Sequence, residues 1–193
     1  MRCIQQIAIA TLVVSQLSFA QSQAVRRPID VQHSTLTVRA FKAGLFSGFA
    51  HDHEISAPIS KGFIDDSAAA KVDFLVEVSS MKVLDPKLPA DKRAEVQETM
   101  LGESVLDAKR YPEIHFVSTQ IKPNGQNRWI VTGNLTLHGE THAGAAEVSS
   151  ASGHYTGSAT LSQREFGIKP ISIAGGTIKV KDQIKIEFDI VAK

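Results

Sequence analysis

The stretch from Val105 to Gly139 is the most informative part of the sequence for the fold. It reads VLDAKRYPEIHFVST over residues 105–119 and ends in GNLTLHG over residues 133–139. Charged residues of helical or turn character precede Tyr111, and Pro112 disfavours a helical conformation at the residue before it. Apolar and polar residues then alternate from Glu113 onward, and the Leu-Thr-Leu run ends in a His-Gly pair that is typical of a turn. This order predicts two neighbouring strands with a sharp boundary in front of them.

Period-two alternation extends over most of the remaining chain and predicts further strands. The apolar members of these strands lie at residues 36–38, 72–78, 114–116, 129–137, 155–161, 178–180 and 184–190. Asn124-Gly125 between two of them is a hairpin signal, because tight turns need residues that accept positive φ. About eight strands in series favour an all-β fold, an antiparallel barrel or sandwich, over parallel units.

One segment breaks the strand pattern and predicts a single short helix. Pro89 precedes a run of good helix formers from Ala90 to Leu101, and Gly102 is a suitable stop. Val96, Met100 and Leu101 give this helix a short apolar side. We therefore expect a helical insertion that lies over one end or one seam of the barrel.

The first twenty residues are typical of a Sec-type signal peptide. Arg2 is followed by an apolar run over residues 7–14 and by Ser-Phe-Ala at residues 18–20, a small-x-small cleavage pattern. We expect residues 1–20 to be removed and residues 21–193 to form one exported domain, periplasmic in a Gram-negative cell. The apolar run is too short to span a bilayer, and no later stretch reaches the roughly 20 apolar residues that a membrane helix needs. The one cysteine, Cys3, lies inside the signal.

Composition and motifs argue against several functions. The chain has 21 basic and 20 acidic residues, so its charge gives no reason to expect a nucleic-acid partner. It contains no G-x-S-x-G elbow, phosphate-binding loop, dinucleotide fingerprint or EF-hand loop. We predict a non-enzymatic protein that requires no cofactor.

The sequence resembles the YceI-like family of lipocalin-like, polyisoprenoid-binding proteins. The Tyr111-Pro112 block carries the resemblance most specifically, and Ile29-Asp30, His33-Ser34 and the residues Arg164, Phe166 and Gly167 extend it over nearly all of the chain after the signal. The family implies a single eight-stranded antiparallel barrel with one helical insertion near its mouth. It also implies a bound polyisoprenoid, isoprenoid quinone or fatty-acid derivative. Arg164 matches an arginine that recurs in the family, either in a structural ion pair or beside an anionic lipid head group.

The interior of such a barrel is either filled by side chains or left open for one ligand. Many strand positions here hold small residues, which leave volume inside the barrel if they face inward and none if they face outward. The residues alone leave both arrangements open, and the family resemblance favours a cavity. The expected apolar contacts to a ligand are Phe41, Phe74 and Met100. A homodimer is left open as well.

A glycine-containing apolar loop follows the first long strand. Residues 42–49 read KAGLFSGF, and Leu45, Phe46 and Phe49 could form the ligand entrance. Two alternatives remain: the same side chains fold back onto the core, or they form a patch that docks on a membrane protein.

His51 and His53 form the sharpest polar pair. If their segment is extended, both rings lie on one face. They could be structural, could contact the polar head of a lipid or quinone, or could bind a metal such as Zn²⁺ with a third ligand. The metal alternative would make the protein a metal- or haem-linked redox or stress protein. In the HGETH stretch we expect Gly139 and Glu140 to form the hairpin turn, and His138 to be structural.

Overall fold

The structure, a computed structural model, describes residues 26–43, 52–65, 70–173 and 178–193. It forms one twelve-stranded sheet, so the predicted all-β class is confirmed. The strands are β1 (Arg26–Pro28), β2 (Thr35–Ala43), β3 (His53–Ser56), β4 (Ile59–Asp65), β5 (Lys71–Glu77), β6 (Lys82–Val83), β7 (Glu113–Pro123), β8 (Arg128–Leu137), β9 (Glu140–Ala151), β10 (His154–Ser162), β11 (Ser172–Ile173) and β12 (Ile178–Val191). The helices described are α1 (Ala90–Leu101) and the 3-10 turns η2 (Val78–Ser80) and η3 (Gln163–Phe166).

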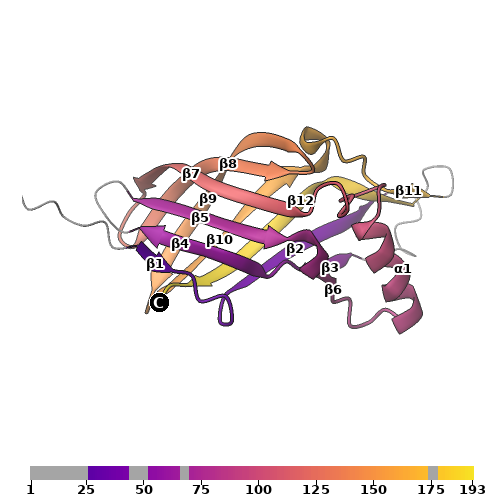
Figure 1. Cartoon of the computed structure of the whole chain (residues 1–193), viewed down its shortest axis with the longest axis horizontal. Coiled ribbons are helices and arrows are strands. Elements are labelled where there is room, and N and C mark those ends of the chain that lie inside the picture. Colours follow the sequence, from indigo (N-terminus) through magenta and orange to yellow (C-terminus); the bar gives the residue numbers. More distant parts are fainter. Residues whose placement is uncertain (1–25, 44–51, 66–69, 174–177) are drawn as a thin grey trace, which may run out of the picture.

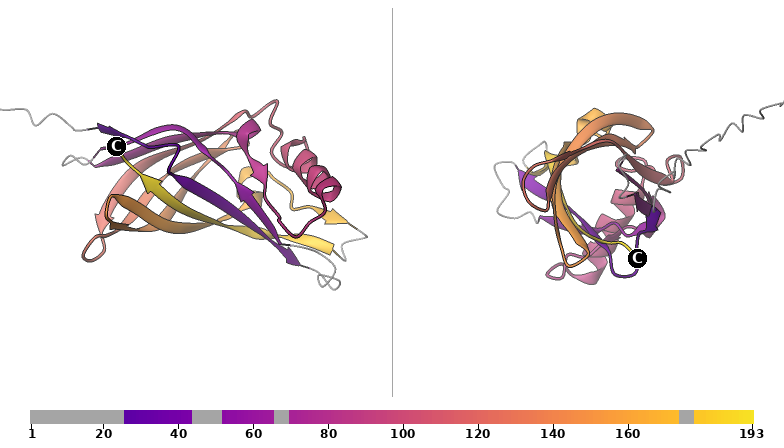
Figure 2. Two further views of the ribbon diagram at one scale, coloured as in Figure 1. Left: turned by 90° about the horizontal axis from the view of Figure 1, so that it is seen from below. Right: turned by 90° about the vertical axis from the view of Figure 1, so that its left-hand side faces the viewer.

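The antiparallel sheet curls into a barrel, as the end-on view of Figure 2 shows. Its strand order is β1-β4-β5-β7-β8-β9-β10-β12-β2-β3-β6. β3 pairs with β2 and β4 pairs with β5, yet only Ala57 and Pro58 separate β3 from β4. At this point the chain therefore passes from the strands beside β2 to the strands beside β5. The bend is held to β2 by Ala57 N, which donates to Leu36 O at 2.9 Å.

The expected number of eight strands was too low. Three short strands, β1, β6 and β11, have two or three residues each, and a bend at Ala57-Pro58 divides one long strand into β3 and β4. Proline lacks the N–H that a continuous ladder would use, so the break falls where the sequence places Pro58. Eight long antiparallel strands remain when the short strands are set aside and β3 and β4 are counted as one.

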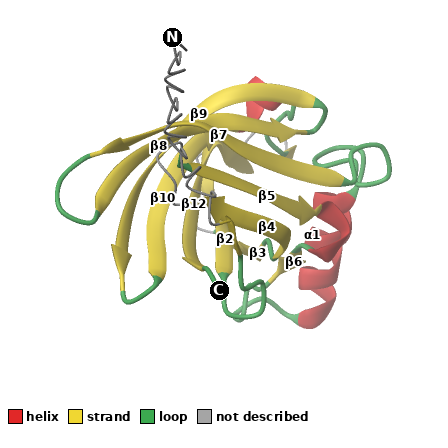
Figure 3. Ribbon diagram, turned by 60° about the vertical axis from the view of Figure 1, so that its left-hand side comes forward, coloured by secondary structure: helices red, strands yellow, loops and turns green. Residues whose placement is uncertain are grey.

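The predicted helix forms α1, with Pro89 as its N-cap and Gly102 as its C-cap. It lies across one end of the barrel (Figures 1 and 3). The Gln97 amide fixes the helix to the neighbouring segment: Oε1 accepts from Val83 N at 2.8 Å, and Nε2 donates to Met81 O at 2.9 Å. Met100 is buried on the side that faces the barrel.

The two tight hairpins of the central strands differ in how well they were predicted. The β7–β8 hairpin forms around Gly125 as expected. In the β8–β9 hairpin, however, the turn residues are His138 and Gly139, with φ of 52° and 80°, and Leu137 pairs with Glu140. The expected turn at Gly139 and Glu140 was therefore wrong by one residue. A type I′ turn needs positive φ at both central residues, and histidine tolerates this conformation better than most side chains.

The expected signal peptide lies outside the described residues. Within the described ranges, no helix is long and apolar enough to cross a membrane.

Candidate functional site

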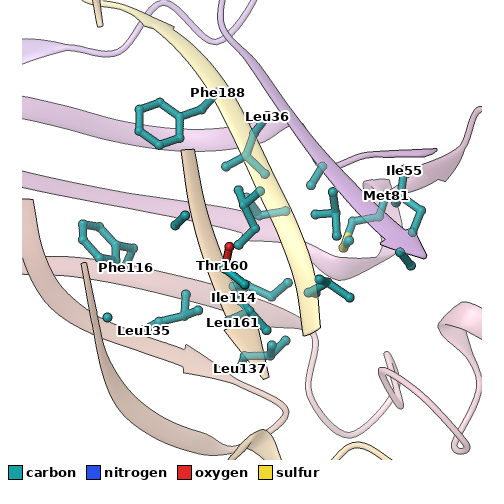
Figure 4. A pocket seen from close by; sticks show the side chains of 18 of the residues that line it. Leu36, Ile55, Met81, Ile114, Phe116, Leu135, Leu137, Thr160, Leu161 and Phe188 are labelled. Atoms are coloured by element: carbon teal, nitrogen blue, oxygen red, sulfur yellow. The ribbon is translucent and has the colours of Figure 1, made fainter. Parts of the chain in front are cut away.

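A cavity of about 1040 Å³ runs through the interior of the barrel. This volume is at the upper end of the roughly 300–1,000 Å³ range of small-molecule sites. Figure 4 shows apolar side chains of several strands pointing into it, among them Leu36, Phe116 and Phe188. The interior is therefore an apolar cavity and not a solid core.

Small inward residues keep this space open. Ala40, Ala57 and Ala159 line the cavity, where larger residues would fill it. On β7 and β8 a bulky residue packs closely against the wall: a Cβ on Gly133 would collide with the ring of Phe116. Of the two arrangements that the sequence left open, the structure thus has alanines facing inward, although Ala143 is exposed on β9.

Charged side chains that line the cavity lie at its two ends. At the end covered by α1 these are Lys42, Lys92, Glu95 and Lys179. Lys92 Nζ lies 2.8 Å from Glu95 Oε1, and this hydrogen bond raises the pKa of Lys92. At the opposite end lies Asp65, a buried residue 3.9 Å from Arg26 Nε. The apolar lining therefore lies between two polar rims.

His53 lies at the helix-covered end, where it lines both the main cavity and a smaller pocket of about 330 Å³. Its Nδ1 lies 2.6 Å from Oδ2 of Asp85, and Asp85 Oδ1 accepts from Glu54 N at 2.8 Å. The Asp85 side chain is only 5% exposed. Since a carboxylate only accepts, Nδ1 is the donor and the Nε2 atom faces away from Asp85. The buried carboxylate thus fixes the orientation of the ring.

Three of the predicted site residues lie on the cavity: His53, Phe74 and Met100. Phe41 does not line it but lines the smaller pocket beside His53. On β2 the inward positions are Leu36, Val38, Ala40 and Lys42, so Phe41 faces outward. Its ring instead lies 6.0 Å from Nζ of Lys181.

Arg164 also lies outside the cavity lining. It is part of η3, and its side chain is 74% exposed. Its Nε lies 3.9 Å from Asp182 Oδ1, and its backbone N–H donates to the same oxygen at 3.0 Å. The pKa of Asp182 is lowered, chiefly by a hydrogen bond from Ser162 and also by this backbone contact. Of its two expected roles, Arg164 therefore has the structural ion pair, with Asp182.

The remaining predicted site residues, Leu45, Phe46, Phe49 and His51, lie outside the described residues. Their roles stay predictions. In the ranges that the structure describes, no group of three or more His, Cys, Asp or Glu side chains could hold a metal ion.

Sequence reasoning missed two kinds of residue. Asp85 was not identified, because no local sequence pattern around it indicates that its side chain contacts His53 in another segment. Most of the cavity lining was not assigned to the site either, although period-two alternation marks it. The apolar lining residues at alternate strand positions are Leu36, Val38, Val72, Val76, Ile114, Phe116, Val131, Leu135, Leu137, Leu161, Ile184, Ile186, Phe188 and Ile190.

Comparison with known sequences gives one family. Residues 28–192 match the YceI-like domain. A UPF0312 protein of Pseudomonas putida is 30% identical over 139 residues, which are 69% of this chain and 66% of that protein. A UPF0312 protein of Shewanella putrefaciens is 25% identical over 183 residues, which are 86% of this chain and 88% of that protein. The chain thus spans just under two thirds of the Pseudomonas putida relative.

Two solved structures share the fold. BcnA of Burkholderia cenocepacia superposes with a TM-score of 0.64 and 21% identity, covering 86% of this chain and 99% of that one. A polyisoprenoid binding domain from Saccharophagus degradans, implicated in plant cell wall breakdown, superposes with a TM-score of 0.58 and 11% identity, covering 89% of this chain and 99% of that one. At these identities the similarity establishes the barrel fold alone.

Proposed function

Because the chain belongs to the YceI-like family, we propose that it is a non-enzymatic binding protein that holds a long apolar or amphiphilic molecule in its barrel. The observation that carries this proposal is the continuous apolar cavity of about 1040 Å³. Each buried CH₂ group contributes about 0.8 kcal/mol, so a chain of several isoprene or fatty-acyl units is held without covalent chemistry.

The candidate ligands are a polyisoprenoid, an isoprenoid quinone and a fatty-acid derivative. An isoprenoid comes first because the Saccharophagus degradans domain with the same fold is described as binding polyisoprenoids. The polar head would lie at the end covered by α1, where His53 presents a ring whose Nδ1 is already held by Asp85. The Nε2 atom of that ring is then the one that contacts a carbonyl, hydroxyl or acidic head group.

The signal-like segment at residues 1–20 supports an exported protein, periplasmic in a Gram-negative cell. Storage, transport or stress protection is the role that such a carrier would serve there.

The test is mass spectrometry of the organic extract of protein purified from its native location, with metal analysis of the same sample. A stoichiometric long-chain lipid or quinone is the expected result. An Ala40→Phe variant, which places a large ring in the cavity, should retain less of that molecule, whereas Ala143→Phe on an exposed position of β9 should retain as much as the unaltered protein. An empty extract together with a stoichiometric metal would contradict the proposal.

A further inference from the structure

Strands β9 and β10 pair over only part of their length. Their register runs from Ala151–His154 to Glu147–Ser158 and stops there. Beyond this point, residues 140–146 continue to pair with β8 and residues 159–162 continue to pair with β12. Within the described chain no pairing joins these two stretches to one another. We call this interruption of the barrel wall the seam, defined by residues 140–146 of β9 and residues 159–162 of β10.

The cavity extends into the seam. Along β2, β5 and β8 no two neighbouring residues line the cavity, as expected for a pleated wall, and β4 and β12 each have one neighbouring pair, Ile64-Asp65 and Lys179-Val180. At the seam, however, three consecutive residues line it on each side, residues 144–146 and residues 159–161. Figure 4 includes both Thr160 and the adjacent Leu161 among the lining side chains. Neighbouring residues of a strand face opposite sides, so Ala145 and Thr160 belong to the outer face. The space therefore continues through the wall.

The six seam residues that line the cavity, 144–146 and 159–161, are one glycine, three alanines, one threonine and one leucine, so none of them is charged. A Cβ added at Gly144 would meet no other atom within 4 Å, so this position borders open space. Ala145 and Thr160 are both exposed. A flexible hydrocarbon chain can pass such a lining without desolvating a charged group, whereas the end covered by α1 presents the Lys92–Glu95 ion pair and two further lysines.

Both limits of the seam are fixed by packing. At one limit, a Cβ on Gly157 would collide with the Glu147 carbonyl, so glycine allows β9 and β10 to come together there. At the other limit, the ring of His142 contacts the ring of Phe166 in η3 edge-on, with centroids 5.1 Å apart. The separation of the strands between these contacts is thus built into the fold.

We propose that the seam is the portal through which the apolar chain of the ligand enters and leaves the cavity. This inference rests on the proposed binding function. The apolar chain of the ligand would enter and leave through the side of the barrel, and its polar head would lie near His53 at the end covered by α1. The portal controls the height of the barrier to exchange and not the free energies of the free and bound states, so narrowing it should change rates and leave affinity unaltered.

The test is stopped-flow uptake of cis-parinaric acid, followed by its release into an excess of phosphatidylcholine vesicles. Ala145→Trp and, separately, Thr160→Trp place a large ring on the outer face of the seam without filling the cavity. Each should slow both uptake and release by about tenfold, with less than about a twofold change in Kd. Ala151→Trp is the matched control, because Ala151 is also exposed on β9 but lies outside the seam, pairs with His154 and does not line the cavity; its rates should equal those of the unaltered protein.

Thr99→Trp tests the competing route, because Thr99 is exposed on α1 and lines the approach to the cavity at the end that α1 covers. Slow exchange in Thr99→Trp, with Ala145→Trp and Thr160→Trp as fast as Ala151→Trp, would overturn the portal while leaving the binding function in place. Failure of the unaltered protein to take up the probe would instead overturn the binding function itself. Seam variants that slow exchange while Thr99→Trp does not would support the portal.

Discussion

The link between Asp85 and His53 provides the sharpest test of how the site is held together. Asp85→Leu keeps most of the side-chain volume and removes both acceptors from a residue whose side chain is 5% exposed. Glu54 N–H then loses its partner at 2.8 Å, and His53 Nδ1 loses its partner at 2.6 Å. A buried donor without a partner costs about 1–3 kcal/mol.

The expected total is smaller than the sum of two such losses. The His53 side chain is 22% exposed, so water can replace part of its lost hydrogen bond. Removing a buried carboxylate also removes its own desolvation cost. We therefore expect Asp85→Leu to lower the free energy of unfolding by about 2–3 kcal/mol.

Urea unfolding followed by far-ultraviolet circular dichroism measures this change. Asp52→Leu is the matched control, because Asp52 accepts one backbone N–H, from Lys42 at 2.8 Å, at an exposed position. It should cost less than about 1 kcal/mol. A double-mutant cycle with His53→Phe should give a coupling of about 0.5–3 kcal/mol between His53 and Asp85. If Asp85→Leu and Asp52→Leu unfold at the same urea concentration, the assigned role of Asp85 is refuted.

Two further predictions follow from the packing and the charges of the wall. Gly133→Val should destabilise the barrel by about 1–3 kcal/mol because its Cβ collides with the Phe116 ring, whereas Gly144→Val, at the position that pairs with Gly133, meets open space and should change the melting temperature little. Equal melting temperatures for the two variants would contradict this packing. Hydrogen bonds from Arg39 and Lys185 lower the pKa of Glu187 from 4.5 to about 2, so Glu187 stabilises the fold above pH 4.5 and this contribution is lost as the pH falls toward 2. The difference in urea stability between the unaltered protein and Glu187→Gln should shrink over that range, and a constant difference would count against the assignment.

Much of the fold was predictable because local chemistry specifies it. The helix over residues 90–101 forms between Pro89 and Gly102, and the alternating segments became strands. The turn at His138 was not placed correctly, because a histidine at φ 52° is stabilised by contacts that come from elsewhere in the sequence. The Tyr111 ring lies 4.5 Å from the His138 ring, and His138 Nδ1 lies 3.0 Å from Phe166 O.

The candidate site was less predictable than the fold. Phe74 and Met100 were assigned to the cavity from their apolar character, and both line it. Phe41 has the same apolar character but alternates with the inward residues of β2, so it faces outward. Period-two alternation predicts which residues of a strand share a face, but which of the two faces lies inside depends on how the sheet curls.

By itself the sequence determined that this chain is an all-β protein of the YceI-like family. It also determined that the chain has one helix and strands in which apolar and polar residues alternate. These properties follow from short-range periodicity and from residues such as proline and glycine that restrict the backbone. Only the tertiary structure decided that the interior is a cavity, that Asp85 holds His53, and that β9 and β10 part at the seam. Each of these depends on the distance between segments far apart in the chain, which is set by closure of the whole barrel and not by any local pattern.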